Sequence, residues 1–120
     1  MKREELMIND WVSLDGEPIQ VAGLQGRKVG VHKRRRSIYC SWHLDSEFQP
    51  ITLTEEILVK NGFRIQVTDD NSKWLWVTDN SWLAYSERHN YWYYEDMKIT
   101  YVHQLQHLLR LCGIEKEIEL

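Results

Sequence analysis

Large aromatic side chains crowd into one short segment, and this crowding limits the possible fold more than any other feature. Four of the six tryptophans fall within residues 74–92, and four of the six tyrosines lie in or beside that segment. Clusters of Asp, Asn, Ser and Glu interrupt the aromatic runs and favour turns. Connections this short join antiparallel strands, because a parallel crossover needs a dozen or more residues. We therefore predict an antiparallel meander with strands at 64–67, 73–78, 82–86 and 91–99.

Alternation along these strands puts large apolar groups on both faces of the predicted sheet. Trp74 and Trp76 share one face of their strand, and Leu75 lies on the other. Trp92 alternates with Tyr91 in the same way. One face needs a helix to cover it. The other face either packs against the rest of the chain or stays open as a binding platform.

Two helices are predicted, one before and one after the meander. The first, at 55–61, has Thr54 as its N-cap, acidic residues in its first turn and Gly62 as its stop. The second helix, at 102–112, has an apolar stripe formed by Val102, Leu105, Leu108, Leu109 and Cys112. We expect this stripe to pack on the meander. The tail at 114–120 alternates imperfectly and predicts at most a short edge strand.

The first forty residues alternate with a period of two and are broken by turn signals such as Asp15-Gly16 and by Gly23 and Gly26. This pattern predicts a small β meander or a partial SH3-like barrel. The chain as a whole is therefore expected to be α+β, with an SH3-like β unit, a short helix, an antiparallel meander and a C-terminal helix packed on it. We expect 1–120 to form a single compact domain, with residue 50 as the candidate seam if it has two lobes, 1–49 and 50–120.

Composition excludes several protein classes. The chain is 42% hydrophobic and 28% charged, with a net charge of −3, which is ordinary for a globular protein. It has no run of 18 apolar residues, and no apolar stretch of signal-peptide length follows its basic N-terminal residues. Its two cysteines, Cys40 and Cys112, are too few for a disulfide scaffold. We expect a cytoplasmic protein in which both thiols are reduced and each cysteine packs as a small buried hydrophobic side chain.

The strongest local charge is a basic run at Lys33, Arg34, Arg35 and Arg36. Six of the 15 basic residues lie within 27–36, on a body that is otherwise neutral to acidic. Such a run can neutralise phosphates, while Tyr39 or Trp42 stacks on a base. The alternative is a solvated hairpin tip that protects the sheet from edge pairing.

Trp74, Trp76 and Trp92 form the second candidate site, an aromatic surface for a sugar, a base or a partner protein. Burial of these rings in the core is the alternative.

No arrangement of residues predicts catalysis or a bound cofactor. His103 and His107 have the i, i+4 spacing of a metal pair, but Gln104 stands where a zinc protease has glutamate. The alternative for this pair is a polar helix face. Cys40 and His43 lack a second ligand pair, so no metal site is predicted.

Three short motifs resemble a set of small uncharacterised bacterial and prophage proteins. Those proteins share a PI-LTEE--LK-GF segment, matched here by Pro50 to Phe63, and a YVHQLQ segment, matched from Tyr101. A start of the form I-DWV, here from Ile8, also fits. The resemblance implies a single unit of about this length and a mobile-element setting, and it brings no activity and no catalytic residues. The basic run and the Trp-rich meander are not parts of the shared pattern.

These observations predict a non-enzymatic interaction module that binds protein or nucleic acid. Two alternatives stay open at this point. The first is an aromatic surface that binds carbohydrate or a base, and the second is a small metal or enzymatic site at His103 and His107.

Overall fold

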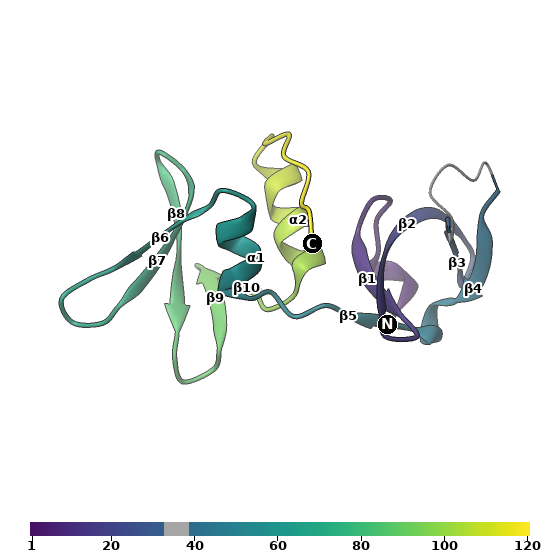
Figure 1. Cartoon of the computed structure of the whole chain (residues 1–120), viewed down its shortest axis with the longest axis horizontal. Coiled ribbons are helices and arrows are strands. Elements are labelled where there is room, and N and C mark those ends of the chain that lie inside the picture. Colours follow the sequence, from purple (N-terminus) through teal and green to yellow (C-terminus); the bar gives the residue numbers. More distant parts are fainter. Residues whose placement is uncertain (33–38) are drawn as a thin grey trace. The chain divides into compact units, whose positions relative to one another are not determined.

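The computed structural model describes residues 1–32 and 39–120, and it shows an α+β chain with two antiparallel five-stranded sheets and two α-helices. The chain divides into two compact units, Met1–Ile51 and Thr52–Leu120, here called unit 1 and unit 2 (Figure 1). Unit 1 is made of strands and short 3-10 turns, and unit 2 holds both α-helices. None of the described helices is long and apolar enough to cross a membrane.

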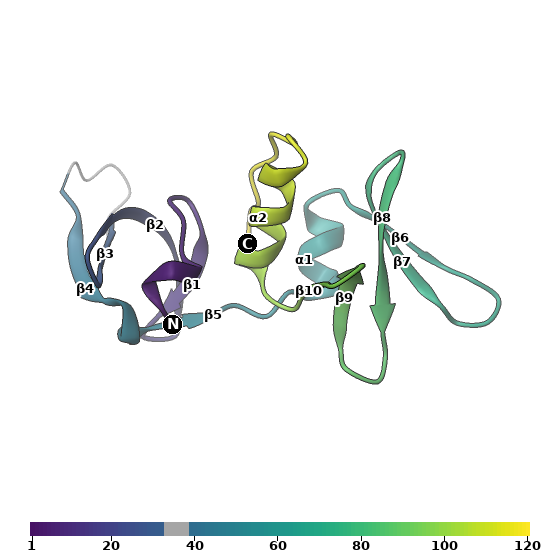
Figure 2. The same ribbon diagram turned by 180° about the vertical axis from the view of Figure 1, so that it is seen from behind.

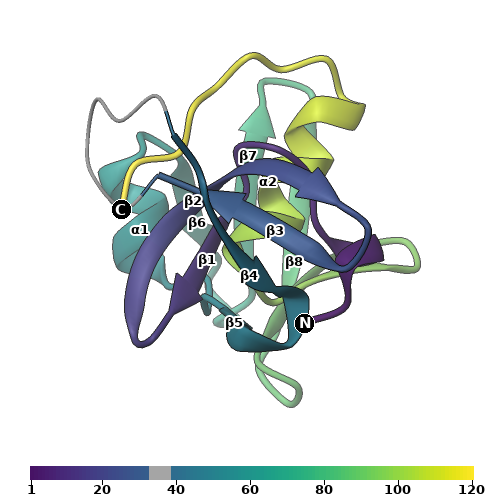
Figure 3. The ribbon, with the colours of Figure 1, turned by 90° about the vertical axis from the view of Figure 1, so that its right-hand side faces the viewer.

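Unit 1 is a curled meander whose last strand returns to pair with the first. Its elements are η1 (Arg3–Glu5), β1 (Trp11–Leu14), β2 (Glu17–Gln25), β3 (Lys28–Val31), β4 (Ser41–Leu44), η2 (Asp45–Glu47) and β5 (Phe48–Pro50). The strand order is β4-β3-β2-β1-β5, and Figure 3 looks onto β2, β3 and β4, which run side by side. The inward side chains form one core, made of Leu6, Val12, Leu14, Val21, Val29, Val31 and Phe48.

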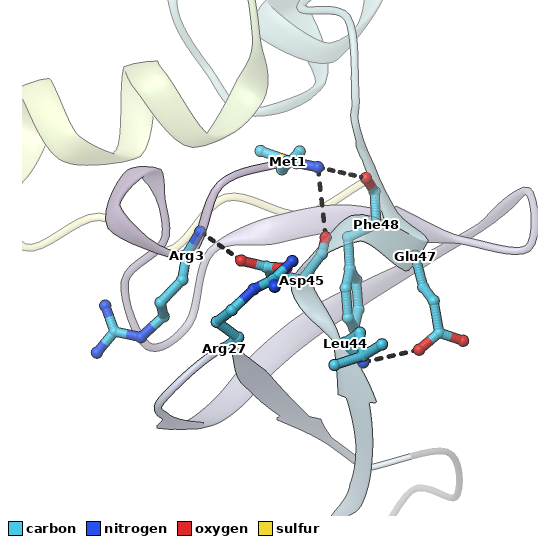
Figure 4. A network of polar contacts seen from close by, with 7 residues as sticks. All are labelled: Met1, Arg3, Arg27, Leu44, Asp45, Glu47 and Phe48. Atoms are coloured by element: carbon cyan, nitrogen blue, oxygen red, sulfur yellow. Dashed lines mark hydrogen bonds and ion pairs between the residues drawn. The ribbon is translucent and has the colours of Figure 1, made fainter.

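A polar network ties the start of unit 1 to η2 (Figure 4). The buried Asp45 carboxylate accepts a hydrogen bond from the Arg3 backbone N–H at 3.1 Å and lies 3.6 Å from the Arg27 guanidinium. The Met1 ammonium donates to the carbonyl oxygens of Asp45 and Phe48 at 3.3 and 3.0 Å. These contacts satisfy a buried carboxylate that would otherwise be costly, and they hold η1 beside η2.

Unit 2 is a second antiparallel meander, covered on one side by helices. Its elements are α1 (Glu55–Lys60), β6 (Arg64–Val67), β7 (Lys73–Thr78), β8 (Ser81–Ser86), β9 (Tyr91–Tyr94), β10 (Met97–Ile99) and α2 (Val102–Leu111). The strand order β10-β9-β8-β7-β6 follows the chain, and both helices lie on the same side of the sheet (Figures 1 and 2). The buried side chains on that side include Leu58 of α1, Leu105 and Leu109 of α2, and Leu75 and Leu83 of the sheet.

The first helix has the capping that its sequence predicts. The Thr54 hydroxyl accepts from the Ile57 N–H at 3.2 Å. Gly62 takes a positive φ of 79°, and the Phe63 N–H then reaches back to the Leu58 carbonyl at 3.0 Å. The second helix uses Gln104 for the same purpose, since its side-chain oxygen accepts from the backbone amides that precede the helix. Both ends of α1, and the start of α2, are therefore fixed locally.

The segment 91–99, predicted as one strand, is a hairpin. β9 ends at Tyr94, and Glu95 takes a positive φ of 51° before β10 begins. The Glu95-Asp96 turn was missed because glutamate is uncommon in the left-handed region, whereas Gly, Asn and Asp are typical of it.

Cys112 was predicted to be buried on the α2 stripe, and this is wrong. The helix ends at Leu111, so Cys112 is the C-cap residue and is exposed. The other members of the stripe are buried as predicted.

The C-terminal tail is held by side-chain contacts and not by strand pairing. Asn61 donates to the Glu119 carbonyl at 2.7 Å and accepts from the Glu119 N–H at 2.7 Å. The side-chain amide therefore takes the place of a neighbouring strand. Ile118 is buried beside this contact, and Lys60 donates to the Leu120 carbonyl oxygen at 2.6 Å.

Replacing Asn61 with alanine should release the tail. We expect Asn61→Ala to lower the free energy of unfolding by about 1–2 kcal/mol, because two hydrogen bonds to Glu119, a third to the Ile57 carbonyl and the seating of Ile118 are lost together. Hydrogen exchange at the Glu119 amide should become markedly faster while the β7 and β8 amides stay protected. Unchanged exchange at Glu119 would contradict this account of the tail.

Candidate functional site

Five aromatic side chains lie on the sheet face of unit 2 that is turned away from its helices. This aromatic face consists of Trp74, Trp76, Trp82, Tyr91 and Tyr93. Cross-strand pairing fixes its membership, because directly paired residues share a face. Trp76 pairs with Trp82, Trp74 pairs with Ala84, and Ala84 pairs with Tyr93.

The rings of the aromatic face pack against one another at steep angles. The Trp76 and Trp82 rings are 5.3 Å apart at 55°, and the Trp74 and Trp82 rings are 6.4 Å apart at 76°. Tyr91 and Tyr93 meet at 6.3 Å and 80°. These edge-to-face contacts shield part of each ring from water without a covering element. Trp82 still has 44% of its surface exposed, and Tyr93 has 39%.

Cationic and amide groups border the aromatic face at both sheet edges. The Arg64 guanidinium of β6 lies 4.8 Å from the centre of the Trp76 ring. On β10, the Lys98 ammonium lies 5.4 Å from the Tyr91 ring. Gln66 accepts a hydrogen bond from the Trp76 indole N–H at 3.1 Å, which fixes the orientation of that ring. On the edge strands β6 and β10 the border is therefore polar and positively charged.

Trp92 does not belong to this surface, although the sequence grouped it with Trp74 and Trp76. It pairs with Tyr85 on the opposite face and is only 3% exposed. That face is the helix side, as shown by Lys73 of β7, whose ammonium reaches Glu55 of α1 at 2.7 Å. This hydrogen bond raises the pKa of Lys73. The structure thus brings two of the three predicted tryptophans together and buries the third.

A hollow of about 390 Å³ adjoins the aromatic face at the β6–β7 turn. It is lined by Thr68, Asp69, Asp70, Ser72 and Trp74. Hydrogen bonds from the Thr68 hydroxyl and then from the Ser72 backbone amide hold the pKa of Asp70 below its ordinary value of 3.8. The hollow therefore combines an ionised carboxylate with one tryptophan ring.

The predicted basic run lies outside the described residues. Lys33, Arg34, Arg35 and Arg36 belong to 33–38, and chain order alone places them between β3 and β4.

His103 and His107 are brought together, but not on a polar face. Their rings are 5.6 Å apart on α2, and His103 is buried with its ring stacked on Tyr101 at 5.9 Å. Within residues 1–32 and 39–120, no three His, Cys, Asp or Glu side chains gather in a way that could hold a metal ion. The polar-face interpretation is wrong for His103, because the Tyr101 ring covers it.

Trp82, Tyr91, Tyr93 and Arg64 were absent from the predicted site although they lie on this face. Alternation along β8 and β9 could have identified the three aromatic residues, because each stands next to a buried residue of its strand. Arg64 carried no such signal, because only the β6–β7 register places it beside Trp76.

Comparison with known proteins gives no family model, curated protein or solved structure that matches this chain.

The two faces of the sheet should respond differently to truncation. Trp92→Ala should lower the free energy of unfolding by about 3–5 kcal/mol, because it leaves a cavity under the helices. Trp82→Ala should cost about 1 kcal/mol or less, because only ring–ring contacts at the surface are lost. Urea unfolding followed by circular dichroism measures both values. Equal losses would show that both faces are core.

The Asp70 carboxylate gives a separate test of the hollow. Thr68→Val removes the main hydrogen bond, so the pKa of Asp70 should rise toward 3.8. Because the folded-state pKa is lowered, these hydrogen bonds stabilise the fold above the unfolded pKa. That contribution disappears as pH falls through the folded pKa. Carboxyl chemical shifts followed by NMR report the titration, and Thr68→Ser, which keeps the hydroxyl, should leave it unchanged.

Proposed function

We propose that the chain is a non-enzymatic interaction module whose aromatic face binds a protein partner. One observation carries the proposal. Five large rings occupy a sheet face that none of the described elements of unit 2 covers, while both helices of the unit cover the other face.

The composition of the aromatic face is that of a protein-binding surface. Trp, Tyr and Arg are the residue types most enriched at the energetic centres of interfaces, and a polar border excludes water around them. Here the tryptophans and tyrosines occupy the middle strands. Arg64, Gln66 and Lys98 lie on the edge strands β6 and β10.

Charge indicates the chemistry of the partner. Unit 2 has eleven acidic and seven basic residues, so its overall field repels polyanions such as nucleic acid. The strand positions that face outward beside the rings nevertheless carry only the cations Arg64 and Lys98. A protein segment with an apolar centre and flanking Asp or Glu complements this arrangement.

Size and ring geometry set the expected affinity and shape. Five strands about 4.8 Å apart give a face about 19 Å wide. The longest strands have six residues and span about 20 Å, so the face covers less than about 400 Å². This area is smaller than the roughly 800 Å² per partner of a standard stable interface, so binding should be weak and transient. Rings that cross at 55–80° present a stepped surface, which suits branched side chains better than one flat sugar or base.

A neutral carbohydrate is the second candidate, and the hollow beside Trp74 favours it. Stacking of a sugar on an exposed ring commonly combines with hydrogen bonds to nearby carboxylates and hydroxyls. Thr68, Asp70 and Ser72 supply these groups at the border of the aromatic face.

The wider setting belongs to the same proposal. The return of β5 to β1, preceded by the 3-10 turn η2, supports an SH3-like topology for unit 1. A bacterial, prophage-related origin rests on the three short motifs that resemble such proteins. A cytoplasmic location accords with two free cysteines.

Selection from a random peptide display library tests the proposal directly. We expect enriched peptides to combine aromatic or aliphatic residues with Asp or Glu, and to bind with micromolar dissociation constants. Trp82→Ala and Tyr93→Ala should each weaken the binding of synthetic peptides about tenfold or more, because both rings are central to the aromatic face.

Tyr94 offers a matched control. It follows Tyr93 on the same strand, is 52% exposed and points to the opposite face, so Tyr94→Ala should leave peptide binding unchanged. Equal loss in Tyr93→Ala and Tyr94→Ala would contradict the proposal. Binding of soluble neutral glycans, but of no peptide, would replace it with the carbohydrate candidate.

A further inference from the structure

In unit 1 the ring of Trp42 lies flat on the backbone of Gly23 and Gly30, here called the glycine bed. A methyl group built on Gly30 would lie 3.1, 3.1 and 3.2 Å from three consecutive atoms of the Trp42 six-membered ring. Nearly equal distances to consecutive atoms place Gly30 under the face of the ring and not at its edge. A methyl group on Gly23 would lie 3.0 Å from the Cη2 atom of the same ring. The indole thus crosses from β4 over β3 to β2.

This arrangement turns one face of the ring outward. Trp42 keeps 45% of its surface exposed although its inner face rests on the sheet. Pairing of Gly23 with Gly30 and of Gly30 with Trp42 fixes the position of the bed. Glycine at both positions removes the side chains that would tilt the ring away from the sheet. The result is an outward-facing aromatic surface that is present before any ligand binds.

A lysine shares the face of the sheet on which this ring lies. Lys28 is two residues before Gly30 on β3, so it lies on the same face of the sheet, and it is exposed. The chain from Pro18 to Leu44, which includes all of β3 and β4 and most of β2, contains six Lys and Arg residues and no Asp or Glu. Four of the six lie in 33–36, between these two strands in chain order.

A flat exposed ring with a lysine on the same face of the sheet is a combination that can bind an unpaired base and its phosphate. We infer that Trp42 and Lys28 on the outer face of β3 and β4 form a binding site for single-stranded nucleic acid. The ring stacks on one base, and the lysine contacts the backbone phosphate. Duplexes fit poorly, because their bases are already stacked and paired. This inference concerns unit 1 and is independent of the partner proposed for unit 2.

Fluorescence anisotropy with end-labelled oligothymidylate and oligouridylate of about 12 nucleotides tests the site. Both should bind at about 50 mM salt and weaken at about 200 mM, because phosphate contacts release counterions. Comparison of the two distinguishes DNA from RNA as the preferred strand. A duplex of the same length should bind more weakly than either.

Substitutions separate stacking from charge. Trp42→Ala should weaken single-strand binding about tenfold or more with an unchanged salt slope, and Trp42→Phe should recover most of the loss. Lys28→Gln should make the plot of log binding constant against log salt concentration less steep by about one unit, because one phosphate contact is lost. Trp82→Ala is the matched control, because it removes an equally exposed tryptophan from unit 2, and it should have no effect.

Any of three results would contradict the proposed site. The first is that the single strands do not bind at low salt, and the second is that Trp42→Ala and Trp82→Ala have equal effects. The third is that the duplex binds as tightly as the single strands. Polyglutamate that competes for the same ring would instead identify an acidic protein as the ligand. Circular dichroism of Trp42→Ala and Trp42→Phe shows whether each variant keeps the fold, and the Trp42→Phe and Lys28→Gln results test the site if Trp42→Ala does not fold.

Discussion

The structure of unit 2 depends on one imbalance. Its five-stranded sheet carries large apolar side chains on both faces, and two helices cover only one of them. On the covered face, Leu75, Leu83 and Trp92 leave water almost completely, and this burial supplies most of the driving force for folding. On the other face the rings shield one another by crossing at steep angles. That partial shielding keeps a water-exposed aromatic face compatible with a stable fold, and it leaves apolar surface available for binding.

Unit 1 solves a similar problem in a different way. Its exposed Trp42 does not pack against other rings, but rests on backbone that two glycines leave bare. Trp42 and Trp82 are almost equally exposed. One is a single flat ring with Lys28 on the same face of the sheet, and the other is part of a stepped cluster with Arg64 and Lys98 at its strand edges. The exposed fraction of a tryptophan therefore does not indicate its ligand. The surface beneath the ring and the charges near it are what distinguish the ligand proposed for Trp42 from that proposed for Trp82.

Much of the fold follows from local sequence signals. Thr54, Gly62 and Phe63 specify α1 within a dozen residues, and alternation around Trp74 and Trp76 correctly predicts a strand with two apolar faces. Alternation assigns side chains to opposite faces within one strand, but it does not align one strand with the next. That alignment needs the register, which is why Trp92 was grouped with Trp74 and why Arg64 was missed. The contact of Asn61 with Glu119 spans 58 residues and has no local signal.

The glycine bed under Trp42 ties three positions of the sequence together. A methyl group at Gly23 or Gly30 would come within about 3.1 Å of the indole, so a side chain at either position forces the Trp42 ring to shift and favours a smaller residue at 42. Related chains should accordingly show correlated changes at 23, 30 and 42, with paired glycines wherever 42 is aromatic. Such covariation would trace the gain or loss of the flat ring during divergence, even in chains whose ligand has not been measured.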